Sequence, residues 1–223
     1  MIKLCIFDLD GTVLDTIATI AHYGNYALIK NGIEAIEACE YKYLAGTGIA
    51  NLIKNMLNFR QCYTEELYER VFHDYDTAYN ADVSYKSTVF DGLKEALDKI
   101  KAIGIKLAIV SNKPDYAAKT VVNSLYGENY FVSVNGQKQG EPLKPDPRVV
   151  LDMLKEQNVK KEECLYIGDT SVDMKTGKNA GIFTIGVLWG FRGREELTEN
   201  GADIVIEKPA ELYDYVLHNA KLN

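Results

Sequence analysis

A short apolar run that ends in two carboxylates constrains this chain more than any other stretch. The run Leu4–Phe7 is apolar without alternation, which predicts a buried strand, and Asp8 and Asp10 follow it before a turn at Gly11. Side chains of an extended chain repeat every second residue, so the two carboxylates point to the same side. Two such acids repel each other unless a cation or a proton lies between them. Because open α/β sheets bind ligands where their strands end, this stretch is predicted to be a reaction centre.

The part of the chain after about residue 86 alternates between predicted helices and apolar strands. Strands that are apolar without alternation, separated by helices, are typical of a parallel sheet covered on both faces. The sequence therefore predicts a Rossmann-like, doubly wound α/β core. Its further strands are expected at 106–110, 131–134, 164–168, 183–187 and 203–206, and its helices at 93–103, from Pro114 onward, from Pro147 to about 157, 172–179 and 210–218.

The segment between the first strand and residue 85 contains no strand pattern. Helical spacing of apolar residues predicts helices at 17–31, 34–43, 49–58 and 65–81. We therefore expect an all-helical cap domain over residues 15–85, inserted into a core domain made of residues 1–14 and 86–223. The turn-prone flanks, 15–16 and 85–92, are the expected hinges of such a lid.

The charge balance narrows the choice of partners. The net charge is −7 and the isoelectric point is about 5.1, which argues against nucleic acid or an anionic membrane as the main partner. No stretch approaches the length of a membrane span, and the strand-like start carries no signal-peptide pattern. We expect a cytoplasmic protein, and the sequence leaves open whether it is a monomer or a homodimer.

Polar side chains follow other predicted strands as well. Ser111 and Asn112 come directly after one strand, Asp169 comes after another, and Lys144 lies in a loop between Leu143 and Pro145. The carboxyl ends of parallel strands share one edge, so these groups can meet Asp8 and Asp10 there. Clustered carboxylates suit Mg²⁺, which prefers carboxylates together with a substrate phosphate. Taken alone, Ser111-Asn112 is more typical of a helix start, and an isolated loop lysine such as Lys144 is usually a solvated charge.

Taken together, these motifs resemble those of a known enzyme family. The run Asp8–Thr16 resembles the first motif of the haloacid dehalogenase superfamily, most of whose members are Mg²⁺-dependent phosphatases. Its three later motifs have counterparts in the right order. They are Ser111, Lys144, and Gly168-Asp169 with Asp173. Within the superfamily the chain is most similar to phosphoglycolate phosphatases, over essentially its whole length. The resemblance implies a phosphatase whose substrate is a small phosphorylated metabolite.

The resemblance also implies a role for each motif residue. Asp8 is expected to be the nucleophile that forms an aspartyl-phosphate, and a ligand of Mg²⁺. Asp10 is expected to protonate the leaving alkoxide and then to deprotonate the attacking water, with its backbone carbonyl on the metal. Lys144 is expected to contact both nucleophile and phosphate. Ser111 and the Asn112 backbone N–H are expected to bind phosphate oxygens, and Asp169 to bind the metal.

For Thr12, Asp173 and the Gly-rich loop of the cap, the sequence allows two interpretations each. Thr12 is either a helix cap or a phosphate ligand. Asp173 completes a capping box with Thr170, or it contacts Lys144 or a metal-bound water without binding the metal itself. In the cap, Thr47 and Gly48 lie in a short Gly-rich stretch that is either a substrate-binding loop or an ordinary turn between helices.

Other functions remain open on the sequence alone. A phosphomutase or a pyrophosphatase of the same superfamily would use the same motifs, although mutases typically carry Glu-Asp where this chain has Gly168-Asp169. A non-catalytic module that senses phosphate through a phospho-Asp, such as a receiver domain, also combines acids, a Ser or Thr and a Lys. Receivers are about half this length and have no helical insert.

Overall fold

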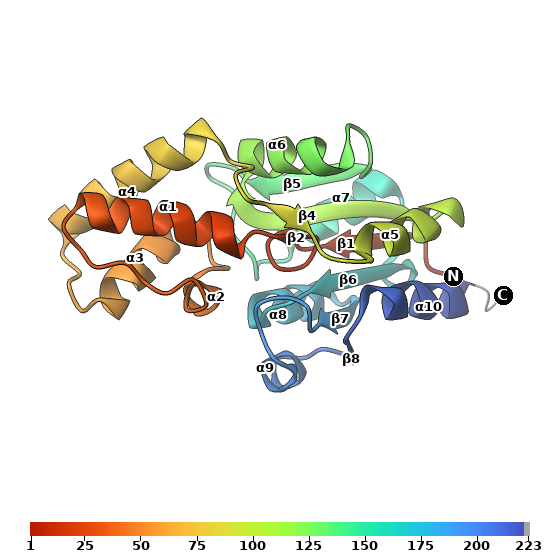
Figure 1. Ribbon diagram of the computed structural model, residues 1–223. Coiled ribbons are helices and arrows are strands. Elements are labelled where there is room, and N and C mark those ends of the chain that lie inside the picture. The colour runs from red at the N-terminus through yellow and green to blue at the C-terminus, as the bar shows by residue number, and fades with distance from the viewer. Residues whose placement is uncertain (221–223) are drawn as a thin grey trace.

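The first strand lies in the middle of a parallel sheet, as its apolar run predicts. In the computed structural model, which describes residues 1–220, the sheet has six strands in the order β5-β4-β1-β6-β7-β8 (Figure 1). All neighbouring pairs are parallel. The strands are β1 (Leu4–Phe7), β4 (Lys106–Pro114), β5 (Ser133–Gln137), β6 (Cys164–Gly168), β7 (Phe183–Val187) and β8 (Ile204–Ile206).

The sheet is covered by helices on both faces, because its central strand is apolar at every position. Alternate side chains of β1 point to opposite faces of the sheet. Cys5 and Phe7 pack with helices α5, α6 and α10 on one face, whereas Leu4 and Ile6 pack with helices α7 and α8 on the other. The doubly wound α/β prediction is thus confirmed. These helices are α5 (Leu93–Ala102), α6 (Asp115–Tyr126), α7 (Arg148–Gln157), α8 (Ser171–Ala180), α9 (Arg194–Glu199) and α10 (Pro209–Ala220), with a 3₁₀ turn at Lys161–Glu163.

The strand order places the predicted reaction centre at a topological switch point. From β1 the chain continues to β4 and β5 on one side of the sheet, and then to β6, β7 and β8 on the other. Ligands bind outside the carboxyl ends of the strands at such a point. Asp8, which follows the last residue of β1, stands there.

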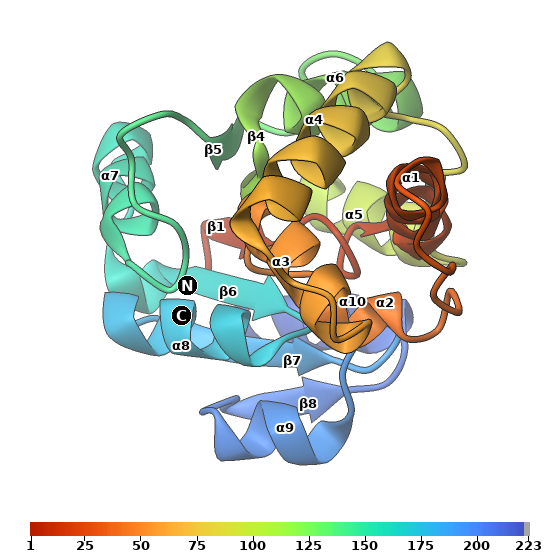
Figure 2. The same cartoon turned by 90° about the vertical axis from the view of Figure 1, so that its left-hand side faces the viewer.

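The helical segment packs around an apolar cluster that Ala117 and Phe191 of the sheet domain also join. It lies at one end of the sheet, away from the two chain ends, in Figure 1, and in front of the sheet in Figure 2. It contains α1 (Ile17–Lys30), α2 (Tyr41–Leu44), α3 (Ile49–Phe59) and α4 (Glu65–Ala81). A short antiparallel pair, β2 (Leu14–Asp15) with β3 (Thr88–Val89), joins it to the sheet domain. Asp15, Thr88 and Val89 of this pair fall within the flanks predicted as turn-prone hinges. We call residues 15–85 the cap, and its role as a separate, closing domain stays a prediction.

The predicted helix over 34–43 is wrong for most of its length, since only Tyr41–Leu44 is helical. Side chains from elsewhere bind its backbone. The Asn25 amide pairs with both the N–H and the carbonyl of Ile36, and the Arg60 guanidinium donates to the carbonyls of Glu34 and Ala35. These tertiary hydrogen bonds replace those a helix would make.

Elements of the sheet domain also differ from the sequence prediction. The strand predicted to end at Val110 extends to Pro114, because β5 still pairs with it there after a shift in register. β5 itself covers Ser133–Gln137 rather than 131–134, and α9 was not predicted. None of the helices formed by residues 1–220 is both long enough and apolar enough to cross a membrane.

Candidate active site

Asp8 and Asp10 stand at the carboxyl end of β1, on a turn whose shape requires glycine. Gly11 has φ +91°, in the left-handed region, and a Cβ on it would lie 2.3 Å from a carboxylate oxygen of Asp169. The turn can therefore bring the first motif against Asp169 only because residue 11 has no side chain. Asp8 is 7% exposed and lines a cavity together with Asp10.

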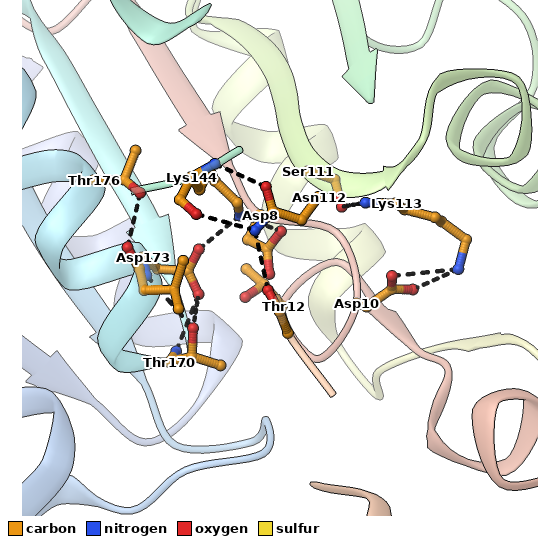
Figure 3. A network of polar contacts seen from close by, with 12 residues as sticks. Asp8, Asp10, Thr12, Ser111, Asn112, Lys113, Lys144, Thr170, Asp173 and Thr176 are labelled. Carbon is orange, nitrogen blue, oxygen red and sulfur yellow. Dashed lines mark hydrogen bonds and ion pairs between the residues drawn. The ribbon is translucent and has the colours of Figure 1, made fainter. Parts of the chain in front are cut away.

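Lys144 lies between two buried carboxylates (Figure 3). Its Nζ is 2.6 Å from Oδ1 of Asp8 and 2.8 Å from Oδ1 of Asp173, and its side chain is 4% exposed. Its backbone N–H donates to Asn112 Oδ1 at 2.8 Å. The predicted contact of Lys144 with Asp8 is therefore present, and this lysine is not a solvated charge.

Asp173 satisfies both of the interpretations that the sequence left open. Its Oδ2 accepts the Thr170 backbone N–H at 3.1 Å and the Thr170 hydroxyl at 2.7 Å, which completes a capping box at the start of α8. Its Oδ1 accepts from Lys144. Gly168 allows this arrangement, since a Cβ there would lie 2.2 Å from the Asp173 Cβ.

Asp169 is fully buried and held by two donors. The Thr12 hydroxyl donates to Oδ1 at 2.6 Å, and the Phe191 backbone N–H donates to Oδ2 at 2.8 Å. The hydroxyl of Thr12 is thus directed at a carboxylate, and Thr12 is not among the described residues that line the cavity. This geometry favours a third role, that of orienting Asp169, over helix cap or phosphate ligand.

Ser111 and Asn112 stand on the extended end of β4. The Ser111 hydroxyl oxygen accepts the Lys113 N–H at 3.2 Å, and its own proton is free to be donated into the cavity that Ser111 lines. The Asn112 side-chain amide donates to the carbonyls of Gly46 in the cap and of Lys144, at 3.1 and 3.3 Å. Asn112 therefore ties the cap loop to the lysine loop, and its backbone N–H stays the group predicted to bind phosphate.

The Gly-rich loop of the cap reaches the cavity with its glycines. Gly46 and Gly48 line the cavity wall, and Gly48 has φ +90°. Thr47 is half-buried and is not among the described lining residues, and its carbonyl accepts from Asn51 at 2.9 Å. The substrate-binding prediction for Gly48 keeps a structural basis, whereas the one for the Thr47 hydroxyl has none in this geometry.

Sequence reasoning missed Lys113, whose Nζ is 2.9 Å from Oδ1 and 3.3 Å from Oδ2 of Asp10. Its side chain is 5% exposed. The missed signal was strand alternation, since an extended chain through Ser111 places Lys113 on the same side. It also missed several cavity residues from the cap helices, namely Ile20, Ile49, Tyr75 and Tyr79.

Burial and mutual repulsion make Asp8 and Asp169 reluctant to ionise. Burial, together with the charge of Asp173, raises the pKa of Asp8 to about 7, although Lys144 opposes the shift. Burial, then Asp173 and Asp8, raise the pKa of Asp169 well above its ordinary value. Burial alone would lower the pKa of Lys144, but Asp173 and Asp8 outweigh it and hold that pKa well above the ordinary value.

The donor set fits a divalent cation. Asp8, Asp169 and Asp173 each offer an oxygen within 4.8 Å of the others, and all three are buried. When these three carboxylates and that of Asp10 are ionised, they carry four negative charges, and the ammonium groups of Lys113 and Lys144 carry two positive ones. The site then has an excess of two negative charges. A divalent ion would neutralise that excess, and hard oxygen ligands suit Mg²⁺ or a similar cation.

We expect Mg²⁺ to raise the melting temperature more at about pH 8 than at about pH 5.5. The pKa of Asp8 is higher in the folded chain than in the unfolded one. Between about pH 4 and 7 the folded state therefore holds a proton on Asp8 that the unfolded state has lost. Without metal, the free energy of unfolding falls as the pH rises through that range. Mg²⁺ needs the carboxylate, so at low pH it must displace that proton.

Differential scanning fluorimetry with and without about 10 mM MgCl₂ measures this effect. A shift of about 5–10 °C at the higher pH corresponds to Mg²⁺ at roughly 100 times its dissociation constant. The shift at the lower pH should be clearly smaller. Equal shifts at both pH values would contradict binding at Asp8.

The arrangement is that of an enzyme: acids and lysines from strand ends, a loop and the start of α8 meet at the switch point of a doubly wound sheet, beside a helical segment. The chain belongs to the haloacid dehalogenase-like hydrolase family, whose sequence model matches residues 5–187. It is thus a hydrolase, and it is similar to phosphoglycolate phosphatases in both sequence and structure.

The relatives match the chain over nearly its full length. The phosphoglycolate phosphatase of Vibrio vulnificus (strain CMCP6) is 28% identical over 98% of both chains, and that of Aquifex aeolicus is 30% identical over 94% of both. Among solved structures, a candidate phosphoglycolate phosphatase from Lactobacillus delbrueckii is 28% identical, with a TM-score of 0.91 over 96% of this chain and 98% of its own.

Proposed function

We propose that the chain is a Mg²⁺-dependent phosphatase that hydrolyses a small phosphate monoester of the 2-phosphoglycolate type through a phosphorylated Asp8. The observation that carries the proposal is the contact of Lys144 with Asp8 beside the Asp169–Asp173 carboxylates, at a cavity that Asp10 also lines. The substrate type comes from the similarity to phosphoglycolate phosphatases.

In the first half of the reaction, a carboxylate oxygen of Asp8 attacks the phosphorus and the bond from phosphorus to the leaving oxygen breaks. Asp10, held by Lys113, gives a proton to that oxygen. Lys144 neutralises the nucleophile, which would otherwise repel a phosphate dianion. The Ser111 hydroxyl and the Asn112 N–H are placed to hold phosphoryl oxygens.

In the second half, Asp10 takes a proton from a water molecule that attacks the phosphorus, and the bond to the Asp8 oxygen breaks. Asp8, Asp169 and the Asp10 carbonyl would hold the Mg²⁺ ion, with Asp173 orienting Lys144. When bound, the ion supplies positive charge to the phosphoryl oxygens. The cap would close over the site and exclude water other than the reacting molecule.

The test is phosphate release by the purified protein from 2-phosphoglycolate, p-nitrophenyl phosphate, pyrophosphate and β-glucose 1-phosphate, with Mg²⁺ or with a chelator. Repeated Mg²⁺-dependent turnover of the monoesters supports the proposal. Preference for pyrophosphate, or isomerisation of the sugar phosphate, would assign one of the rival activities. A single phosphorylation without turnover would indicate a sensing module.

We expect Asp169→Asn to raise the Mg²⁺ concentration needed for half-maximal activity by at least about tenfold. The amide keeps an oxygen that accepts from Thr12 and Phe191, but it loses the charge that attracts the cation. A Mg²⁺ titration of activity measures the change. Asp152→Asn, an exposed carboxylate paired with Lys155, is the matched control. An unchanged titration for Asp169→Asn would remove this residue from the ligand set.

A further inference from the structure

Side chains from the cap form one wall of the cavity beside Asp8. The volume of this cavity is about 60 Å³. The wall facing the strand ends comes from α1, α3, α4 and the Gly-rich loop. A space of this size beside Asp8 suits a small leaving alcohol.

Tyr79, on α4, is part of this wall and has an unsatisfied hydroxyl. The residue is 2% exposed and lines the cavity, and its hydroxyl oxygen is buried without a hydrogen-bond partner. The Lys113 ammonium lies near this oxygen and opposes the rise that burial causes in the pKa of Tyr79. Because an ammonium can only donate, it gives the proton of the Tyr79 hydroxyl no acceptor. In the part of the chain that the structure describes, the only other such atom is the Thr16 hydroxyl, which does not line the cavity. A buried hydroxyl without a partner costs stability, so native structures rarely retain one without a reason.

Two other buried tyrosines of the same cluster are satisfied. Tyr23 packs edge-on against Tyr79 with ring centroids 5.6 Å apart, and its hydroxyl donates to the Asp82 carbonyl at 2.7 Å. The hydroxyl of Tyr41 donates to Asn25 at 2.9 Å. The cap therefore provides partners for these two hydroxyls, whereas the buried hydroxyl of Tyr79 has none.

Tyr79 lies at the end of the cavity where the leaving group departs. The Lys113 ammonium is 5.4 Å from the centre of the Tyr79 ring and is bonded to Asp10, which contacts the leaving oxygen in the proposed reaction. Figure 3 shows this Lys113–Asp10 pair on the side of Asp8 away from Lys144. A group of the substrate that meets Tyr79 therefore belongs to the alcohol and not to the phosphate.

We propose that Tyr79 determines specificity by hydrogen bonding to a second oxygen function on the leaving alcohol, a few bonds from the phosphate ester oxygen. The inference rests on the proposed phosphatase function. The Tyr79 hydroxyl donates to that oxygen, and the nearby Lys113 charge favours an oxygen that is negatively charged. Alcohols without such an oxygen leave the hydroxyl unpaired in the complex, so their esters are poor substrates.

The experiment compares 2-phosphoglycolate with ethyl phosphate, a two-carbon ester that lacks the second oxygen function. We expect the wild type to prefer 2-phosphoglycolate. Tyr79→Phe should lower kcat/KM for 2-phosphoglycolate by about 10-fold to 100-fold and leave that for ethyl phosphate nearly unchanged. Its melting temperature should stay equal or rise, because the hydroxyl that is removed has no partner in the free protein.

Tyr23→Phe is the matched control, since it removes a satisfied hydroxyl from the same cluster. It should lower the melting temperature and keep the wild-type preference between the two esters. An unchanged preference in Tyr79→Phe, or a wild type that does not distinguish the esters, would overturn the inference while leaving the phosphatase intact. A wild type that releases phosphate from no ester would instead refute the proposed function, and this inference with it.

Discussion

Asp8→Asn is expected to lower the rate of phosphate release by at least about 10⁴-fold, because an amide cannot form the phosphoryl-enzyme bond. The substitution preserves size and shape at a position that is 7% exposed. Lys144 keeps its second partner, since Asp173 lies 2.8 Å from its ammonium. Loss of activity should therefore not reflect loss of the fold.

Stability provides an independent readout for this variant. The pKa of Asp8 is raised to about 7 in the folded state. Above that pH Asp8 is ionised, and its buried charge lowers the stability of the fold. Without metal at about pH 8, Asp8→Asn should be as stable as the wild type or more so. Circular dichroism and thermal melting test this, with Asp152→Asn as the control.

The intermediate itself can also be sought. Acid quenching during turnover, followed by peptide mass spectrometry, should place the phosphoryl group on Asp8 in the wild type and nowhere in Asp8→Asn. Appreciable steady-state activity in the variant would show that another group is the nucleophile.

Sequence reasoning reached the core motifs because strand periodicity and topology act together. An apolar run such as β1 can be recognised as buried, and parallel strands bring their carboxyl ends to one edge. Asp8, Asp169 and Lys144 could therefore be expected to meet, although 136 residues separate Asp8 from Lys144. The capping-box pattern also predicts the local partner of Asp173, Thr170, because that contact spans only three residues.

The cap was harder to predict because its contacts are tertiary. The helix expected over 34–43 is mostly absent because Asn25 and Arg60 bind its backbone, and no local pattern reveals such partners. Tyr79 could not be distinguished from the other tyrosines, since only the packed structure shows that its hydroxyl is unpartnered. Lys113 was hidden for a related reason, since a strand was expected to end where β4 in fact continues.

Lys144→Met is expected to have the largest effect on stability, with a loss of about 3–5 kcal/mol in the free energy of unfolding without metal. The substitution leaves Asp8 and Asp173 buried without their shared cation, at positions where Lys144 now lies 2.6 and 2.8 Å from them. Chemical denaturation at about pH 8 measures the loss. At about pH 5 it should be smaller, because a protonated Asp8 needs no counter-charge.

Measurements of activity separate the catalytic role of Lys144 from its role in balancing buried charge. Lys144→Met should also lower kcat by about 10³-fold, since nothing then offsets the repulsion between Asp8 and a phosphate dianion. Adding Asp173→Asn removes one of the two orphaned charges, so the double variant should regain part of the stability but none of the activity. A lysine that only balanced buried charge would let the double variant recover both. A stability loss below about 1 kcal/mol in Lys144→Met would contradict the buried pairing itself, since a loss that small is typical of exposed ion pairs.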